Sequence, residues 1–344
     1  MTLRPLVVGL GRAGAGLHLP ALARIRRDGS ARAVLDDAPP LTFDVCPGRG
    51  GGLGAVVDSL AQAASTTSPD RTVVHLCTPP TQRLESFACL AGLGYRRFIV
   101  EKPLAVGEAD RTAVSVLCRR FRLDVVVMAQ WSVSALTDRI DTILRGGCLG
   151  APRSLSIVQD KPRFTRSLAS NDHPTVFDVE MPHGVGLALH LAGAATVRAA
   201  RCDDMTVDGL RLPSMGRARL HLRHASGAGS TLTSDLTAPV CARTLTVKLE
   251  HGTVIGHYPV SAADNYAQLT VRVAGDRHRT VFHDDALTAF VLAAYRHFAG
   301  SGELAGNLAH NLAVARLLGE AKAEAKAQAT ARTQTPGQGA GHVR

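Results

Sequence analysis

A glycine-rich turn close to the start of the chain constrains the fold more than any other feature of the sequence. Gly9, Gly11 and Gly14 lie where an apolar run at residues 6–10 ends and a helical pattern at residues 14–27 begins. Glycines at this spacing allow a tight strand-to-helix turn, close approach of the backbone to a pyrophosphate, and close packing of the helix on the sheet. The helix N-terminus also favours phosphate charge. The turn therefore predicts a Rossmann dinucleotide-binding unit, and its candidate cofactor-binding residues are Gly9, Gly11, Arg12, Ala13 and Gly14.

The first third of the chain alternates apolar runs with helical patterns, which is typical of βαβ units around a parallel sheet. The predicted strands are residues 6–10, 41–45, 72–77, 98–100 and 124–128, and the predicted helices are residues 14–27, 55–64, 81–93 and 108–120. Beyond a helix at residues 135–144, apolar residues alternate with a period of two, which predicts an antiparallel sheet with one exposed face. Its predicted strands are residues 154–158, 217–222, 231–236, 245–249, 270–273 and 279–282, and two helices follow at residues 285–298 and 306–325.

A chain of 344 residues is too long for one compact core, so two domains are expected. The predicted fold class is α/β, with an N-terminal Rossmann domain over residues 1–128. An α+β domain with a large, open, mostly antiparallel sheet follows over residues 129–327. The last stretch, residues 328–344, is rich in Ala, Thr, Gln and Gly, which predicts a disordered tail.

Composition argues against several classes of protein. The net charge is +10, but the arginines are spread along the chain and aromatic residues make up only 4%, so no nucleic-acid partner is expected. The positive field favours a phosphorylated cofactor or substrate instead. No apolar run is long enough for a membrane helix, which predicts no membrane partner. Seven scattered cysteines without a Cys-x-x-Cys pair predict no metal site and, with no apolar leader before the first strand, a cytoplasmic protein.

An acidic residue at the end of the second strand would bind the adenosine ribose of a dinucleotide. Asp44 is the candidate, ahead of Asp36 and Asp37, although its spacing from the glycine turn is longer than usual. Arg49 lies just beyond and suits a 2′-phosphate instead. The sequence therefore leaves both NAD and NADP open as the cofactor.

Two short motifs follow the next strands of the parallel sheet. Thr78-Pro79 comes directly after strand 72–77, and Glu101-Lys102-Pro103 directly after strand 98–100. Both motifs lie at the carboxyl edge of the sheet, where ligands bind in such folds. Lys102 is one of only five lysines in the chain. A lysine at this edge can hydrogen-bond a reacting hydroxyl and lower its pKa, which makes Lys102 a candidate catalytic residue.

In their order and spacing, the glycine turn, Thr78-Pro79, Glu101-Lys102-Pro103 and a later histidine segment resemble the glucose–fructose oxidoreductase and inositol dehydrogenase family (Gfo/Idh/MocA). The resemblance spans most of the chain. It implies a Rossmann domain followed by an open sheet that often pairs between subunits, and hence a homodimer or homotetramer. It also implies that Thr78, Pro79, Glu101 and Lys102 contact the cofactor, and that Lys102 contacts the substrate hydroxyl as well.

The resemblance further implies a catalytic histidine at the start of a helix in the second domain, with an acidic residue shortly before it. His183 matches this position, because Pro182 suits the first turn of a helix. His183 would take the hydroxyl proton during oxidation, or return it during reduction. The usual place of the acidic residue is occupied by Val179. Asp178 and Glu180 both remain candidate catalytic partners, and Glu180 is better placed because three residues is close to a helical turn.

Other departures from the family concern the substrate pocket. A histidine that is frequent in the family after the Thr-Pro motif is replaced by Arg83, and a later aspartate falls near Gly186. Arg83 is a candidate for binding an anionic group such as a phosphate. Lys161, which follows strand 154–158, and Trp131, the only tryptophan, are the remaining substrate-binding candidates.

Together the motifs predict an NAD(P)-dependent oxidoreductase that moves a hydride between nicotinamide and a secondary hydroxyl or ketone of a sugar, cyclitol or related polyol. Lys102 would orient and polarise the hydroxyl, and His183 would exchange its proton. Two alternatives stay open. One is an imine or ketone reductase of a specialised, antibiotic-type pathway, and the other is a dinucleotide-binding regulator without turnover.

Overall fold

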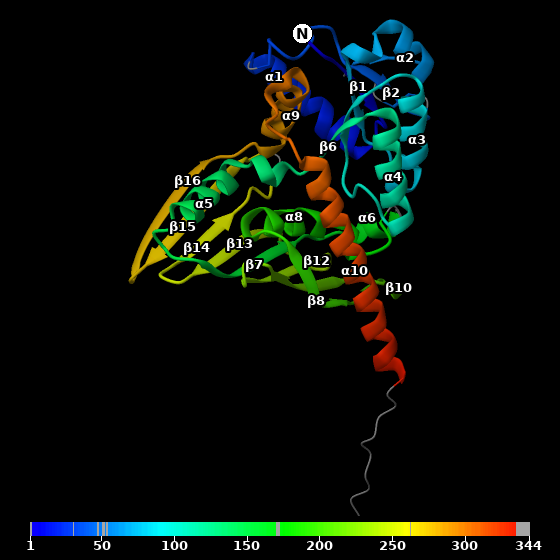
Figure 1. Ribbon diagram of the computed structural model, residues 1–344. Helices are drawn as coiled ribbons and strands as arrows, with labels where there is room; N and C mark the ends of the chain where they lie inside the picture. Colours follow the sequence, from blue (N-terminus) through cyan, green and yellow to red (C-terminus); the bar gives the residue numbers. More distant parts are fainter. Residues whose placement is uncertain are drawn as a thin grey trace, which may run out of the picture.

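The protein is described by a computed structural model, in which the chain forms two β-sheets that lie one above the other (Figure 1). The structure describes residues 2–29, 31–46, 48–49, 52, 54–169, 173–261 and 263–334. The first sheet lies beside the N-terminus. A long helix, α10 (Asn307–Gln334), contacts strands of both sheets and so joins the two parts of the molecule.

The first sheet is six-stranded and parallel, in the order β3-β2-β1-β4-β5-β6. Its strands are β1 (Arg4–Val8), β2 (Leu41–Phe43), β3 (Ala55–Val56), β4 (Thr72–Leu76), β5 (Arg97–Val100) and β6 (Asp124–Val127). This is the strand order of a Rossmann fold, with the carboxyl ends of β1 and β4 side by side at the point where the order reverses. The predicted N-terminal Rossmann architecture is therefore confirmed.

Helices cover both faces of this sheet, as is usual for parallel strands. All five residues of β4 are buried as a result. The glycine turn passes into a short π-helical segment, η1 (Gly14–His18), which continues as α1 (Leu19–Asp28). The remaining helices of this part are α2 (Leu60–Thr66), η2 (Pro69–Arg71), α3 (Pro80–Gly92) and α4 (Glu108–Phe121).

The second sheet is eight-stranded, in the order β16-β15-β14-β13-β7-β12-β11-β8. Its strands are β7 (Pro152–Asp160), β8 (Ala195–Cys202), β11 (Arg217–His224), β12 (Gly229–Asp235), β13 (Ala242–Leu249), β14 (Thr253–His257), β15 (Tyr266–Val273) and β16 (Asp276–His283). A small hairpin, β9 (Met205–Val207) and β10 (Leu210–Leu212), stands apart. Only β7 and β12 pair in parallel within the described sheet, so the predicted large, mostly antiparallel sheet is confirmed.

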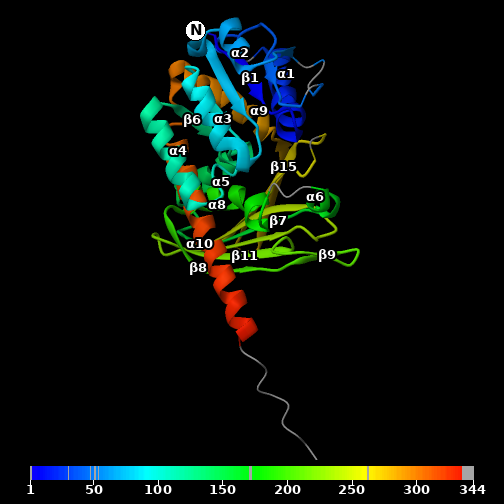
Figure 2. The ribbon, with the colours of Figure 1, turned by 90° about the vertical axis from the view of Figure 1, so that its right-hand side faces the viewer.

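The helices of the second part lie between its sheet and the first domain, as Figures 1 and 2 show. They are η3 (Gln130–Val133), α5 (Ala135–Gly146), α6 (Phe164–Ala169), α7 (Val176–Val179) and α8 (Met181–Ala192). The opposite face of the sheet carries none of the helices that the structure describes. Along β11 and β12, buried residues alternate with more exposed ones, as expected for a sheet with one covered and one open face.

After β16 the chain returns to the Rossmann sheet. Helix α9 (Ala286–Arg296) packs beside α1, and the π-helical segment η4 (His297–Ser301) continues from its end. The buried side chains of Phe290 and Tyr295 share one apolar core with Val7 and Ile99 of the parallel sheet. A segment that follows the whole second sheet in sequence therefore completes the core of the first.

Several element boundaries differ from those predicted. Residues 55–64 were expected to be one helix, but Ala55 and Val56 pair with β2, and α2 begins only after Ser59, whose hydroxyl accepts the Gln62 N–H as a helix cap. Strands β8 and β14 and the β9–β10 hairpin were not predicted. Helix α10 continues to Gln334, into the stretch predicted as a tail, whose residues 328–334 include the good helix formers Ala, Arg and Gln. Residues 335–344 lie outside the described part of the chain. No helix in the described residues is long and apolar enough to cross a membrane.

Candidate active site

The three glycines of the turn do different things. Gly9 has a φ of +89°, and a Cβ atom placed on it would lie 2.9 Å from the backbone of Cys77. A Cβ atom on Gly14 would lie 2.0 Å from the carbonyl oxygen of Gly9, so helix and strand could not approach as they do. A Cβ atom on Gly11 would meet nothing within 4 Å. Gly9 and Gly14 thus hold the turn together, whereas Gly11 leaves an open space against the backbone, which fits a pyrophosphate.

Asp44 follows β2 and reaches back to this turn. Its carboxylate accepts the backbone N–H of Leu10 at 2.6 Å and that of Cys46 at 2.8 Å. The guanidinium of Arg49 lies 3.9 Å from the same carboxylate and is about half exposed. The structure therefore brings the predicted ribose-binding acid and the predicted phosphate-binding arginine to one end of the glycine turn, and both NAD and NADP remain compatible with it.

Arg83 lies beneath the two motif loops. Its side chain is 4% exposed and donates to the carbonyl oxygens of Thr78, at 2.8 Å, and Pro103. Burial lowers the pKa of the guanidinium to about 10. Arg83 therefore ties the Thr78-Pro79 loop to the Glu101-Lys102-Pro103 loop, because its two terminal nitrogens donate to the backbone of both. Thr78 Oγ1 is buried and has no hydrogen-bond partner among the described residues, which leaves it for a ligand.

A buried chain of side chains that the sequence did not predict runs behind Glu101. His18 Nε2 lies 3.0 Å from Glu101 Oε1, His18 Nδ1 lies 2.7 Å from His75 Nδ1, and His75 Nε2 lies 2.9 Å from the Tyr295 hydroxyl. Burial disfavours a charged His18, but Cys77 and Glu101 outweigh it and raise its pKa to about 10. Burial and the charge of His18 keep the pKa of His75 well below its usual value. Protonated His18 then donates to both neighbours, and neutral His75 donates to Tyr295.

Lys102 points from the first domain toward the second. Its Nζ donates to the carbonyl oxygen of Val179 at 2.5 Å, and its backbone N–H donates to Glu101. The Lys102–Pro103 peptide bond is cis. Burial lowers the pKa of the Lys102 ammonium, and the carboxylates of Glu180 and Glu101 oppose that fall. The amine is therefore a half-buried cation held at the boundary between the domains.

Glu180 and Asp178, the two candidate acids, lie in different surroundings. Glu180 accepts from Lys161 Nζ at 3.0 Å and is 6% exposed. Burial would raise its pKa, but the charges of Lys102 and Lys161 hold the pKa well below the usual range. The carboxylate of Asp178 instead accepts from Lys322 of α10 at 2.9 Å and from the Thr175 hydroxyl at 2.8 Å. Glu180 therefore acts on Lys102, whereas Asp178 anchors α10.

His183 lies in the first turn of α8, next to Pro182, as predicted. Its ring stacks on Trp131, with ring centroids 5.6 Å apart, and Trp131 stacks in turn on Tyr258 at 4.3 Å. Burial and the charge of Lys102 lower the pKa of His183 to about 3, although Glu180 opposes this. The imidazole is therefore neutral at physiological pH.

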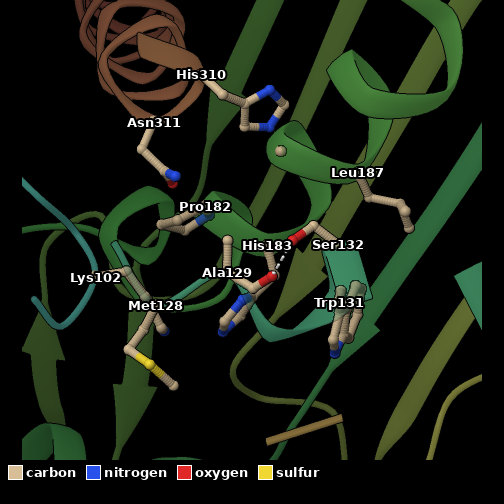
Figure 3. A pocket seen from close by; sticks show the side chains of 11 residues that line it. Lys102, Met128, Ala129, Trp131, Ser132, Pro182, His183, Leu187, His310 and Asn311 are labelled. Carbon is tan, nitrogen blue, oxygen red and sulfur yellow. Dashed lines mark hydrogen bonds between the residues drawn. The ribbon is translucent and has the colours of Figure 1, made fainter. Parts of the chain in front are cut away.

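Lys102 and His183 line one small pocket at the boundary between the domains (Figure 3). Its wall consists of Lys102, Met128, Ala129, Trp131, Ser132, Pro182, His183, Gly186, Leu187, His310 and Asn311. The side chains of His310 and Asn311 come from α10 and were not predicted. Nothing in the sequence pattern marks them, because they enter the site only through the path of that helix. Among the described residues, no group of His, Cys, Asp and Glu side chains is arranged to hold a metal ion.

Comparisons with known proteins agree with this architecture. No protein-family model and no curated protein matches the chain. Solved structures do match: KijD10, a 3-ketoreductase from Actinomadura kijaniata in complex with NADP and TDP-benzene, has a TM-score of 0.77 at 14% identity, over 94% of this chain and 98% of that one.

Two further solved structures are equally similar. An oxidoreductase from Agrobacterium radiobacter in complex with NAD⁺, L-tartaric acid and magnesium has a TM-score of 0.76 at 14% identity, over 95% of this chain and 97% of that one. A candidate NADPH-dependent oxidoreductase from Desulfitobacterium hafniense has a TM-score of 0.78 at 13% identity, over 95% of this chain and 96% of that one. The chain shares their fold.

Proposed function

We propose that the protein is an NAD(P)-dependent oxidoreductase that interconverts a secondary hydroxyl and a ketone on a sugar, cyclitol or related polyol. One observation carries the proposal. A half-buried lysine and a neutral histidine from different domains, Lys102 and His183, line one cavity at the carboxyl edge of a Rossmann sheet. An amine that polarises a hydroxyl beside an imidazole that takes its proton is the pair of groups that alcohol oxidation needs.

The residues present fit a dinucleotide. The open space at Gly11, the N-terminus of the helix that follows, and the unpartnered Thr78 hydroxyl would hold its pyrophosphate and neighbouring groups. Asp44 or Arg49 would hold the adenosine ribose or its 2′-phosphate. The similar solved structures hold NADP or NAD⁺, which supports the same choice of cofactor here. When bound, the nicotinamide would supply or accept the hydride.

The protein side chains would handle the proton and the orientation of the substrate. Neutral His183 would accept the hydroxyl proton during oxidation and become an imidazolium. The Lys102 ammonium would keep its proton and stabilise the negative charge that develops on the oxygen. Glu180 would keep Lys102 charged, since its carboxylate raises the pKa that burial lowers. Trp131, which lines the cavity and stacks on Tyr258, would form part of an apolar wall for a ring-shaped substrate.

A second candidate is the reverse reaction, reduction of a ketone on a sugar carried by a nucleotide. KijD10 is a 3-ketoreductase crystallised with NADP and TDP-benzene, and this likeness favours the second candidate over an imine reductase. The same Lys102 and His183 would serve, with His183 returning the proton. A regulator without turnover would bind the dinucleotide, but Lys102 and His183 would then have no chemical role.

The test is a screen of sugars, inositols, aminocyclitols and TDP-keto-sugars with NAD and NADP, each in its oxidised and reduced form. The absorbance of the reduced nicotinamide reports turnover. We expect turnover with at least one polyol or keto-sugar and a preference for one cofactor. Tight cofactor binding with no absorbance change for any of these substrates would favour the regulator. The homodimer or homotetramer stays a prediction, to be measured by sedimentation in the same preparations.

A further inference from the structure

The ring of His183 makes no hydrogen bond to any other described residue, and the dashed bond beside it in Figure 3 joins Ser132 to Ala129. The buried histidines His18 and His75 differ, because both ring nitrogens of each lie 2.7–3.0 Å from a partner. A histidine that transfers protons is usually oriented by a hydrogen bond to its second nitrogen. Because no such bond holds His183, packing must orient its ring.

The packing partner of this ring is Trp131. The indole of Trp131 stacks on His183 with ring centroids 5.6 Å apart and 26° between the ring planes. The indole also stacks on Tyr258, at 4.3 Å and with 2° between the planes. The Tyr258 hydroxyl lies 2.8 Å from the hydroxyl of Thr137, and Trp131, Tyr258 and Thr137 are all buried. A stack of aromatic rings that is anchored on α5 therefore orients His183.

The stack lies where the two domains meet. Trp131 stands on η3, which follows β6 of the Rossmann sheet, whereas His183 stands on α8 of the second domain. The two elements η3 and α8 pack together. Trp131 and His183 line the same cavity as Lys102. The indole therefore contacts the imidazole beside the amine that would face the reacting oxygen.

The contact matters most when His183 carries a proton. Burial and the charge of Lys102 both lower the pKa of His183, so an imidazolium is unfavourable here. Proton transfer from a substrate hydroxyl would nevertheless create one. A cation within about 6 Å of the centre of an aromatic ring is attracted by the electron-rich face, most strongly by that of Trp and where water is excluded. The ring of Trp131 lies within this distance of His183.

We propose that Trp131 is the positioning residue of His183: its indole orients the imidazole by stacking and stabilises the imidazolium that forms when the substrate hydroxyl gives up its proton. The proposal rests on the proposed function. One proton passes from the hydroxyl oxygen to a ring nitrogen of His183 while the hydride goes to the oxidised cofactor, and both return in reduction. Trp131 should therefore affect kcat, whereas a residue that only walled the substrate would affect KM.

The test compares Trp131→Phe with Trp131→Leu. Phenylalanine keeps a ring that can stack, whereas leucine fills part of the space without one. We expect Trp131→Leu to lower kcat about tenfold or more while the KM of the substrate changes less than about threefold, and Trp131→Phe to keep most of kcat. The matched control is Phe87→Leu, which removes one ring of the buried pair Phe87 and Phe98 outside the cavity. It should lower stability and leave kcat unchanged.

A second measurement does not depend on turnover. The ring current of an indole displaces the NMR signals of a ring that stacks on it, so the ring protons of His183 should have displaced signals in protein labelled only at histidine. His183→Gln identifies these signals by their absence. We expect the displacement to persist in part in Trp131→Phe and to disappear in Trp131→Leu. Trp131→Met, whose flexible side chain fills irregular space, replaces the leucine variant in both measurements if that variant fails to fold.

Three results would overturn the proposal. A raised KM with unchanged kcat in Trp131→Leu would leave Trp131 as a wall of the substrate site. Equal losses of kcat in the leucine and phenylalanine variants would show that the size of the side chain matters and the stacked ring does not. His183 signals that stay in place in Trp131→Leu would contradict the stack itself. Absence of turnover with every substrate of the screen would instead overturn the proposed function, while the NMR comparison would still confirm or reject the stack.

Discussion

His18 Nε2 lies 3.0 Å from Glu101 Oε1, and this buried pair stands directly behind Lys102. His18 comes from the helical segment after the glycine turn, and Glu101 from the end of β5. The pair therefore links the part of the molecule that would bind phosphates to the loop that carries the candidate catalytic lysine. Tyr295 of α9 reaches the same chain through His75, so a helix from the far end of the sequence supports the site.

His18→Asn should destabilise the protein strongly. The substitution leaves the Glu101 carboxylate buried without its cation, and breaking a buried ion pair in this way costs about 3–5 kcal/mol. The measurement is urea unfolding at neutral pH. His221→Asn is the matched control, because His221 lies on the open face of β11 and bonds only Thr231 among the described partners. Equal stabilities for the two variants would contradict the structural role of His18.

Stability should depend on pH through the same pair. The pKa of His18 is raised to about 10, so its contribution is complete below pH 6.5 and declines as the pH rises from 6.5 through 10. The hydrogen bond and charge of His18 outweigh burial and lower the pKa of Glu101 to about 2, so that contribution is complete above pH 4.5 and lost as the pH falls toward 2. Thermal unfolding from pH 5 to 10 should show a decline above pH 6.5 that is absent in His18→Asn.

Gly11→Ala and Gly14→Ala should fail for different reasons. At Gly14 the added methyl would lie 2.0 Å from the Gly9 carbonyl oxygen, so the variant should lose several kcal/mol of stability or not fold. At Gly11 the methyl meets nothing within 4 Å, so the fold should persist within about 1 kcal/mol while dinucleotide affinity falls. Unfolding and cofactor titration, monitored by the fluorescence of the single tryptophan, measure both. Unchanged cofactor affinity in Gly11→Ala would contradict the prediction that the cofactor pyrophosphate binds at the glycine turn.

The fold was predictable where the sequence pattern is local. The parallel sheet follows from short apolar runs broken by glycines and helices, and the glycine turn fixed its first crossover. Strand β8 was not predicted because it holds mostly small residues and two arginines three positions apart, so it shows no period of two. Strand β3 escaped because two residues are too few to show a period.

The site was predictable only where a motif marks it. Lys102 and His183 stand in motifs, and both line the cavity. His18 and His75 carry no such signal: one falls in a helical pattern and the other inside an apolar strand, and only the packing of η1 on β4 brings them together. Arg83 shows the opposite case. Its place in the motif suggested an anion site, whereas the fold directs its donors to the carbonyl oxygens of Thr78 and Pro103.

Glu180→Gln should move the alkaline limb of the pH profile of kcat. The Glu180 carboxylate raises the pKa of Lys102, so its removal lowers that pKa further and the amine loses its charge at a lower pH. The limb should therefore shift to lower pH by about 1 unit or more. Asp178→Asn is the matched control: it breaks the contact with Lys322, should lower stability, and should leave the limb in place. A shift of the limb in Asp178→Asn but not in Glu180→Gln would identify Asp178, not Glu180, as the acid that supports Lys102.

The most direct test of the account is the rate of hydride transfer in Lys102→Met, measured by the absorbance of the reduced nicotinamide with the best substrate of the screen, beside the cofactor affinity of the same protein. Removing the cation that faces the reacting oxygen should lower kcat by about 100-fold or more, while cofactor affinity changes by less than about tenfold. A Lys102→Met protein that keeps most of its turnover would contradict the proposed role of the Lys102 and His183 pair.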